Sequence, residues 1–396
     1  MAARPTRVDR GAVVAILQPH RLIHGRATAL LPAMGRALSG SGPAMFVVAD
    51  GEQPPPSMRV WEPIDDDVAL VVATSGTTGT PKGALLTSSA LTASAQATHR
   101  RLGGPGSWLL ALPANHIAGL QVLARSVLAG TTPVELDVST GFEVAAVPDA
   151  VGRMASGRRY TALVAVQLAK ALEHREATSA LAELDAVLLG GGPAPLPVLE
   201  AAMNAGITVV RTYGMSETSG GCVYDGLPLD GVRLAVGEDG RVRIGGATVA
   251  KGYRNPVEPD PFVGPGWFVT DDLGSLDAAG NLTIRGRVDD AISTGGLTVF
   301  PHRVETVLSA HPAVSDCAVF GVPDDRLGQR VAAAVVLRPS ANAPTLAELR
   351  MFVGSSLDET AAPRELHVLE ALPRRGIGKV DRAALTRLAD SAPDTR

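Results

Sequence analysis

A run of glycines, hydroxyl residues and one lysine at residues 74–83 (TSGTTGTPKG) carries the first chemistry that the sequence offers. It follows the continuous apolar stretch 68–73, which predicts a buried strand. Backbone N–H groups, hydroxyls and a cation that meet at the end of a strand form a natural site for phosphate oxygens. The spacing is not that of a Walker loop. A flexible surface turn is the alternative, but ten residues in this order favour a phosphate-binding loop with Lys82 as its cation.

Further segments stand in a fixed order behind this loop. They are residues 190–193 (GGGP), 213–218 (YGMSET), 266–274 (GWFVTDDLG), 286–290 (GRVDD) and 372–382 (LPRRGIGKVDR). From about residue 66 to residue 382 the chain thereby resembles the adenylate-forming superfamily of acyl-CoA synthetases, peptide-synthetase adenylation domains and luciferases. The resemblance implies that the protein uses ATP to convert a carboxylic acid to an acyl-adenylate, with ATP, Mg²⁺ and coenzyme A as its cofactors.

The resemblance also assigns roles to single residues. Tyr213 would stack on adenine, Ser216 would bind phosphate and Glu217 would hold Mg²⁺. A hard cation that bridges phosphates needs a carboxylate, so the residue type agrees. Asp272 would accept hydrogen bonds from the ribose hydroxyls, and Arg287 would lie near ribose and phosphate. Taken alone, Tyr213 would be a core aromatic and Glu217 a helix-capping acid.

Two positions depart from the family's usual pattern. Ser216 stands where threonine is usual and keeps the hydroxyl, whereas Asp271 stands where glycine is usual. Asp271 would change the local backbone or add a charge near the nucleotide. The full set of expected nucleotide contacts is Thr74, Ser75, Gly76, Thr77, Thr78, Gly79, Lys82, Gly191, Gly192, Tyr213, Gly214, Ser216, Asp272 and Arg287.

A second half-reaction follows from the same resemblance. Asp289 would be the hinge about which a small domain rotates, and Gly295 and Gly296 would then face the pantetheine of coenzyme A. Lys379 would stabilise the charge that builds on the substrate carboxylate and α-phosphate in the first step. Solvated acids and a surface lysine are the ordinary alternatives. The chain has only four lysines, however, and one stands at each expected catalytic position. The expected catalytic groups are Thr78, Lys82, His116, Glu217 and Lys379.

Residues 112–126 (LPANHIAGLQVLARS) bear on the identity of the acid. His116 matches a family histidine that gates the acyl pocket. In a helix, Ala118, Gln121 and Arg125 share one face, and a cation there suits an acid with a second carboxylate. A surface helix charge is the alternative for Arg125.

The same segment resembles that of 2-succinylbenzoate–CoA ligases of menaquinone biosynthesis, in particular the short actinobacterial type. We therefore expect 2-succinylbenzoate as the acid, with Arg125 on its free carboxylate. The expected acid-pocket residues are His116, Gln121, Arg125 and Gly190.

Two other functions stay open. One is an aryl or fatty acyl-AMP ligase that delivers its adenylate to a carrier protein, because Gly295, Gly296 and Lys379 suit either thiol acceptor. The other is a nucleotide-binding homologue without catalysis. The presence of Lys82, Glu217 and Lys379 argues against that second alternative.

The elements around these residues predict an α/β protein in two parts. Apolar strands alternate with helices over residues 68–211, which is typical of parallel sheets covered on both faces. Short alternating strands at 241–244 and 282–284, with a turn at 277–281, predict a small antiparallel, barrel-like part. We expect a large ATP- and acid-binding domain over residues 1–288, shortened at its start, and a small, mobile α+β domain over residues 289–396.

Composition and charge indicate which partners and which cellular location we expect. The net charge of −4 gives no sign of a nucleic-acid partner, so the expected partners are a small carboxylic acid, ATP and coenzyme A. Cys222 and Cys317 form no metal-type cluster. No stretch has the ~20 apolar residues that span a bilayer, and no signal peptide is evident. We therefore expect a cytoplasmic protein. The oligomeric state stays open, with a homodimer as one alternative.

Overall fold

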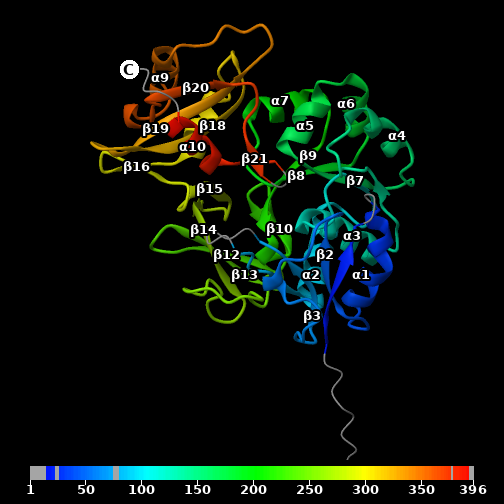
Figure 1. The fold of residues 1–396 in the computed structure, drawn as a ribbon. Coiled ribbons are helices and arrows are strands. Elements are labelled where there is room, and N and C mark those ends of the chain that lie inside the picture. The colour runs from blue at the N-terminus through cyan, green and yellow to red at the C-terminus, as the bar shows by residue number, and fades with distance from the viewer. Residues whose placement is uncertain (1–14, 23–25, 75–79, 376–377, 392–396) are drawn as a thin grey trace, which may run out of the picture.

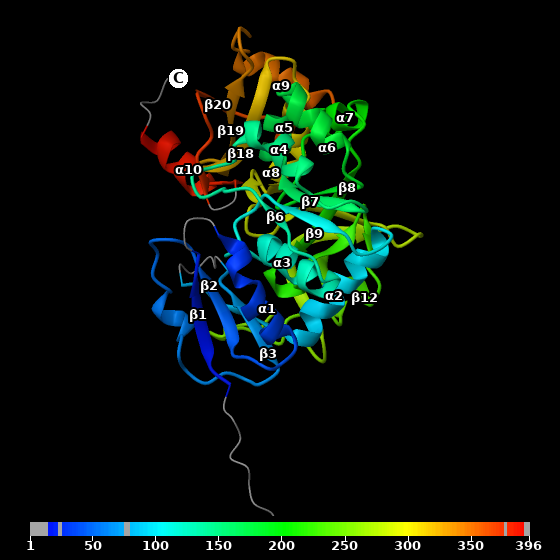
Figure 2. The same cartoon turned by 90° about the vertical axis from the view of Figure 1, so that its right-hand side faces the viewer.

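The computed structural model describes residues 15–22, 26–74, 80–375 and 378–391. A four-stranded sheet begins the fold, with three parallel strands and one antiparallel strand in the order β1-β2-β3-β4. Its strands are β1 (Leu17–Arg21), β2 (Ala44–Val48), β3 (Val68–Val72) and β4 (Ala84–Thr87). Helix α1 (Leu31–Leu38) and helix α2 (Ser88–Arg101) pack near this sheet (Figure 2). The strand predicted at 68–73 is confirmed as β3, and it leads directly into the phosphate loop.

A seven-stranded sheet forms the centre of the large domain, in the order β11-β10-β9-β8-β7-β5-β6. Five neighbouring strands run parallel, and β10 and β11 are antiparallel additions. The strands are β5 (Ser107–Leu110), β6 (Val134–Glu135), β7 (Arg159–Val164), β8 (Ala186–Gly190), β9 (Val209–Met215), β10 (Gly220–Tyr224) and β11 (Leu227–Pro228).

Helices cover both faces of this sheet, as the continuous apolar strands predicted (Figure 1). Neighbouring residues of β5 illustrate the division, because Trp108 joins the core cluster on one face and Leu109 joins the cluster on the other. The covering helices, with α2, are α3 (Ile117–Ala129), α4 (Val147–Gly152), α5 (Ala165–Leu172), α6 (Arg175–Ala182) and α7 (Leu196–Asn204).

Four antiparallel strands complete the large domain, in the order β12-β13-β14-β15. They are β12 (Val232–Val236), β13 (Arg241–Gly246), β14 (Trp267–Leu276) and β15 (Leu282–Arg287). The turn predicted at 277–281 is confirmed, because Oδ1 of Asp277 accepts hydrogen bonds from the N–H groups of Ala279 and Asn281. This sheet places Asp271, Asp272 and Arg287 on adjacent strands.

The C-terminal part has its own sheet and core. Its sheet runs β17-β16-β19-β18, with β20 parallel to β19. Its elements are β16 (Ile292–Thr294), β17 (Leu297–Val299), α8 (Pro301–Leu308), β18 (Val314–Asp324), β19 (Gly328–Leu337), α9 (Leu346–Gly354), β20 (Glu365–Leu369), β21 (Arg374–Arg375), β22 (Lys379–Val380) and α10 (Arg382–Ser391). Thr345 and Glu348 form the capping box at the start of α9.

Some elements differ from the sequence-based expectations. The region of alternating strands and helices was expected to end at residue 211, whereas β9 continues to Met215 and includes Tyr213 and Gly214. The pairing of β9 with β10 explains the extension, since it supplies partners for the backbone of residues 212–215. The short helices α8 and α10 were not predicted. None of the helices within the described ranges is long and apolar enough to cross a membrane.

Candidate active site

The described part of the phosphate loop is held at both ends. The N–H of Lys82 donates to the carbonyl of Thr74 over 3.4 Å, and Gly83 has φ of +73°, which favours glycine. The hydroxyl of Thr74 is buried and has no partner among the described residues. A ligand oxygen would satisfy it, because a buried polar atom without a partner is costly. The five loop residues Ser75, Gly76, Thr77, Thr78 and Gly79 lie outside the described residues.

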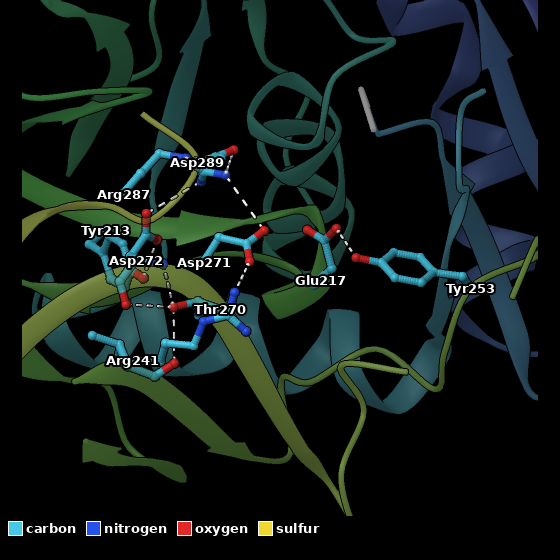
Figure 3. Close-up of polar contacts among 10 residues, drawn as sticks. Tyr213, Glu217, Arg241, Tyr253, Thr270, Asp271, Asp272, Arg287 and Asp289 are labelled. Atoms are coloured by element: carbon cyan, nitrogen blue, oxygen red, sulfur yellow. Dashed lines mark hydrogen bonds and ion pairs between the residues drawn. The ribbon is translucent and has the colours of Figure 1, made fainter. Parts of the chain in front are cut away.

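Lys82 and Glu217 meet at Tyr253, which the sequence analysis did not single out. Nζ of Lys82 lies 5.2 Å from the centre of the Tyr253 ring, and the Tyr253 hydroxyl donates to Oε1 of Glu217 over 2.7 Å (Figure 3). Burial and the Glu217 carboxylate raise the pKa of Tyr253, so the phenol stays a neutral donor. Ser216 lies beside Glu217 in the 3₁₀ turn Ser216–Thr218. A cation and a buried carboxylate are thus brought to one place from three segments.

This arrangement fits a magnesium ion that is shared with phosphates. Within the described ranges no group of three or more His, Cys, Asp or Glu residues could hold a metal. A metal at Glu217 would therefore take its other ligands from phosphate oxygens and water, which is how proteins commonly bind Mg²⁺.

A second cluster joins Tyr213, Asp272 and Arg287 (Figure 3). Oδ2 of Asp272 accepts from the Tyr213 hydroxyl over 2.6 Å, and Nη1 of Arg287 lies 3.3 Å from Oδ1. Burial is the largest reason why the pKa of Asp272 is raised above its ordinary value. The hydroxyl of Tyr213 is therefore engaged at Asp272.

Arg287 also binds the expected hinge residue. Its Nε and Nη2 atoms donate to the two carboxylate oxygens of Asp289, each over 2.8 Å. Burial opposes ionisation of Asp289, but these hydrogen bonds and the charge of Arg287 outweigh it and lower the pKa. Arg287 thus connects Asp272 to Asp289, at the start of the C-terminal part.

The unusual Asp271 binds an arginine. Its Oδ1 atom accepts from Nη2 of Arg241 over 2.7 Å, and its Oδ2 atom lies 3.8 Å from Arg287 (Figure 3). Asp271 is not among the described residues with positive φ, so the backbone does not require glycine there. Asp271 adds a charge to the arginine network, at an irregularity in the β13–β14 pairing.

The expected glycine contacts separate into two groups. A Cβ at Gly190 would lie 2.6 Å from Oγ1 of Thr212, and one at Gly191 would lie 3.0 Å from Val164. A Cβ at Gly214 would collide with the backbone of β10 at Gly220. Strand packing therefore accounts for the glycine at each of these three positions. By contrast, a Cβ at Gly192 would face open space.

The structure places the C-terminal lysine over the ends of the parallel strands. A Cβ at Gly378 would lie 4.0 Å from Val164, at the end of β7. The exposed Lys379 is close to the half-buried His116, which precedes α3. Burial first and the charge of Lys379 second lower the pKa of His116. Gly295 and Gly296 lie in the β16–β17 turn, on the opposite side of the small domain from β21 (Figure 1).

This proximity gives a prediction about histidine ionisation. Replacing Lys379 by methionine removes a positive charge beside His116 and should raise the pKa of the imidazole. The change can be followed by NMR titration of the ring, with His116→Asn used to assign the resonance. An unchanged pKa in Lys379→Met would mean that the lysine does not lie near His116 in solution.

Gln121 and Arg125 are both buried, so the alternative of a surface charge is wrong for Arg125, which is 3% exposed. The guanidinium of Arg125 lies 4.9 Å from the centre of the Trp108 ring and 3.4 Å from the Tyr224 hydroxyl. No carboxylate within the described ranges forms an ion pair with it, and its Nε atom has no partner. Burial lowers the pKa of Arg125. The pKa of His99 is lowered to about 4, first by burial and second by the positive charge of Arg125.

Gln121, four residues before Arg125 on α3, binds a strained turn. Its Nε2 atom donates over 2.7 Å to the carbonyl of Ser219, which has φ of +54° although it is not glycine. The Oε1 atom of Gln121 is buried and has no partner among the described residues. Backbone strain of this kind occurs at ligand sites. Two buried polar atoms of α3, Oε1 of Gln121 and Nε of Arg125, thus have no partner among the described residues, and the buried Arg125 has no carboxylate partner there.

Comparison with known proteins agrees with this fold and these sites. The model of the AMP-binding enzyme family matches residues 46–254, and that of the AMP-binding enzyme C-terminal domain matches residues 303–379. The chain therefore belongs to the AMP-binding enzyme family, a class whose fold has a large α/β domain and a smaller C-terminal domain.

The comparison also identified individual proteins that are similar to this chain. A protein of Mycobacterium tuberculosis named "Probable 2-succinylbenzoate–CoA ligase" is 68% identical over 367 residues, which cover 92% of this chain and 96% of that protein. The solved o-succinylbenzoate CoA synthetase (MenE) of Bacillus subtilis, in complex with the acyl-adenylate intermediate OSB-AMP, has a TM-score of 0.72 and 29% identity, covering 93% of this chain and 82% of that chain. The same Bacillus subtilis enzyme with ATP and magnesium ion has a TM-score of 0.70 and 30% identity, covering 92% and 83%.

Proposed function

We propose that this protein is an ATP-dependent acid–CoA ligase whose acid is 2-succinylbenzoate and whose product enters menaquinone biosynthesis. The observation that carries the choice of acid is the buried Arg125, a cation without a carboxylate partner among the described residues. A dicarboxylic substrate supplies the missing anion. The names of the Mycobacterium tuberculosis and Bacillus subtilis relatives support the same acid.

The first step is adenylation. An oxygen of the substrate carboxylate attacks the α-phosphorus of ATP, the bond from that phosphorus to the bridging oxygen breaks, and pyrophosphate leaves. Lys82 and Lys379 bring positive charge to the phosphates and to the reacting carboxylate, where negative charge builds in the transition state. Glu217 would hold Mg²⁺, which neutralises phosphate charge when it is bound. Tyr253 orients the Glu217 carboxylate.

The nucleotide is bound by the second cluster, which consists of Tyr213, Asp272 and Arg287. Asp272 accepts hydrogen bonds from the ribose hydroxyls and is oriented by Tyr213 and Arg287. The ring of Tyr213 contacts adenine, and Gly192 leaves room at the end of β8 for a flat group. These contacts position ATP rather than react with it, and positioning supplies a large part of the rate enhancement in such reactions.

The acid binds with its reacting carboxylate near His116 and its free carboxylate at Arg125. Both residues belong to the start and body of α3, and Gln121 lies between them. His116 is neutral at neutral pH because its pKa is lowered, so it can accept or donate a hydrogen bond without adding charge. Trp108 and Tyr224 hold the Arg125 guanidinium from the protein side.

The second step is thioester formation. The small domain rotates about Asp289, Lys379 leaves the strand ends, and Gly295 and Gly296 approach the pantetheine of coenzyme A. The thiol sulfur attacks the acyl carbonyl carbon, its proton passes to solvent, and AMP leaves with the oxygen that joined it to the acyl group. The Arg287–Asp289 pair lies at the point about which this rotation takes place.

Product analysis tests this function. Purified protein is incubated with ATP, Mg²⁺, coenzyme A and a panel of acids that includes 2-succinylbenzoate, and pyrophosphate and acyl-CoA are followed by mass spectrometry. We expect both products with 2-succinylbenzoate and neither with the monocarboxylic acids. Pyrophosphate without acyl-CoA would indicate a carrier protein as the acceptor. The absence of both products with every acid would refute the enzyme assignment.

A further inference from the structure

The hairpin that carries Lys379 is braced by an arginine of its own. Strands β21 and β22 pair antiparallel, with Arg374 opposite Val380. The guanidinium of Arg374 donates from Nη1 to the carbonyl of Gly378 and from Nη2 to Oδ2 of Asp316. Arg374 therefore links the residue immediately before Lys379 to β18, a long strand of the small domain's sheet.

The carbonyl that Arg374 binds belongs to the peptide unit between Gly378 and Lys379. A peptide unit is planar, so a hydrogen bond that fixes its carbonyl also fixes the direction in which the next residue leaves it. Gly378 has φ of +90°, in the region that favours glycine. The direction of the Lys379 side chain thus depends on the orientation of this one peptide unit.

The Asp316 carboxylate is oriented to accept the hydrogen bond from Arg374. It lies at an irregularity in the β18–β19 pairing, and its Oδ1 atom accepts from the N–H of Cys317 over 3.0 Å. That contact orients the carboxylate and leaves Oδ2 for Arg374. The side chains of Arg374 and Asp316 are 26% and 38% exposed, and half-exposed ion pairs of this kind contribute little to stability. The pair is better suited to fixing geometry than to stabilising the domain.

Arg382 fixes the other end of the hairpin. Its Nη2 atom donates to Oε1 of the partly buried Glu305 over 2.6 Å, and its Nε atom donates to the carbonyl of Val319 over 3.0 Å. Strand β22 is therefore held on both sides of Lys379.

We propose that Arg374 is a positioning residue for adenylation, which holds the Gly378–Lys379 peptide so that the lysine reaches the reacting carboxylate and phosphate. This inference rests on the proposed function of Lys379 and deepens it. Because Lys379 leaves before thioester formation, Arg374 should govern the first step and not the second. A residue that only stabilised the fold would affect both steps alike.

The test compares Arg374→Gln with Arg330→Gln. Arg330 is a matched control, because it lies in the same domain, pairs with Glu365 over 2.6 Å and also donates to a backbone carbonyl, that of Pro323. We expect Arg374→Gln to slow acid-dependent pyrophosphate release by on the order of 100-fold. Thioester formation from supplied acyl-adenylate should stay within about twofold, and Arg330→Gln should leave both steps within about twofold. Arg374→Lys, which keeps the charge, should restore part of the adenylation rate.

Equal slowing of both steps by Arg374→Gln, or equal slowing by Arg330→Gln, would overturn the proposal. Hydrogen exchange gives a readout that needs no substrate. The amides of residues 374–375 and 378–382 should exchange faster in Arg374→Gln but not in Arg330→Gln. Unchanged exchange in Arg374→Gln would show that Arg374 does not order the hairpin, and would also overturn the proposal. If the unmodified protein released no pyrophosphate with any acid, the proposed function would fail, while the exchange experiment would still decide whether Arg374 orders the hairpin.

Discussion

Lys379→Ala should lose the adenylation step and keep the thioester step. The lysine brings positive charge to atoms that gain negative charge only in the first transition state, and removing one such group costs on the order of 100- to 1000-fold in rate. Acid-dependent pyrophosphate release measures the first step. Formation of acyl-CoA from supplied acyl-adenylate measures the second and should be unchanged.

A second lysine provides the control for this experiment. Lys170 is a lysine of the large domain whose Nζ atom donates to the carbonyl of Phe142 at an exposed site. Lys170→Ala should leave both steps intact. Equal loss of the two steps in Lys379→Ala would contradict the assignment of the lysine to adenylation, and with it the rotation of the small domain between the steps.

Arg125→Met should weaken the use of 2-succinylbenzoate without weakening the fold. Hydrogen bonds to a charged group are worth about 1.5–3 kcal/mol, so kcat/KM for the diacid should fall by about 10- to 100-fold. A monocarboxylic analogue, which has nothing to place at the cation, should be affected much less. Kinetics with both acids measure this difference, and equal losses for both acids would remove the proposed role.

Stability provides the second half of this prediction. A buried charge without a partner is unfavourable, so replacing Arg125 by methionine should leave the free energy of unfolding unchanged or raise it. Arg254 is the contrasting control. It is also buried, but its guanidinium donates to the carbonyls of Met58, Arg59 and Pro63. Arg254→Met should destabilise the protein, by about 1–3 kcal/mol for each carbonyl left unsatisfied. A comparable loss in Arg125→Met would show that Arg125 is structural.

The sequence predicted those parts of the site that short, continuous motifs indicate. The continuous apolar run 68–73 identified β3, and the alternation of apolar strands with helices over residues 68–211 identified the parallel sheet. Tyr213, Asp272 and Arg287 were named from their motifs, and the structure brings them into one hydrogen-bonded cluster.

Contacts between distant segments could not be predicted in this way. Tyr253 lies 36 residues from Glu217, and nothing in the sequence around Tyr253 indicates the hydrogen bond between them. The helical spacing of Gln121 and Arg125 predicted a shared face. It did not show that the face is buried against Trp108 and Tyr224, because burial depends on which strands pack above the helix.

Helix α10 was missed for a related reason. Its apolar residues Leu385 and Ala389 are buried against the sheet of the small domain, but they are few and the segment is short. Isolated helices of this length are marginal, and tertiary packing stabilises them.

The most direct test of the account is exchange of labelled pyrophosphate into ATP in the absence of coenzyme A. An enzyme that forms an acyl-adenylate runs its first step backwards, so exchange needs the acid, ATP and Mg²⁺ but no thiol. We predict rapid exchange with 2-succinylbenzoate, and little exchange without an acid, without Mg²⁺ or in Lys379→Ala. No exchange with 2-succinylbenzoate, or exchange only after coenzyme A is added, would contradict the acyl-adenylate mechanism.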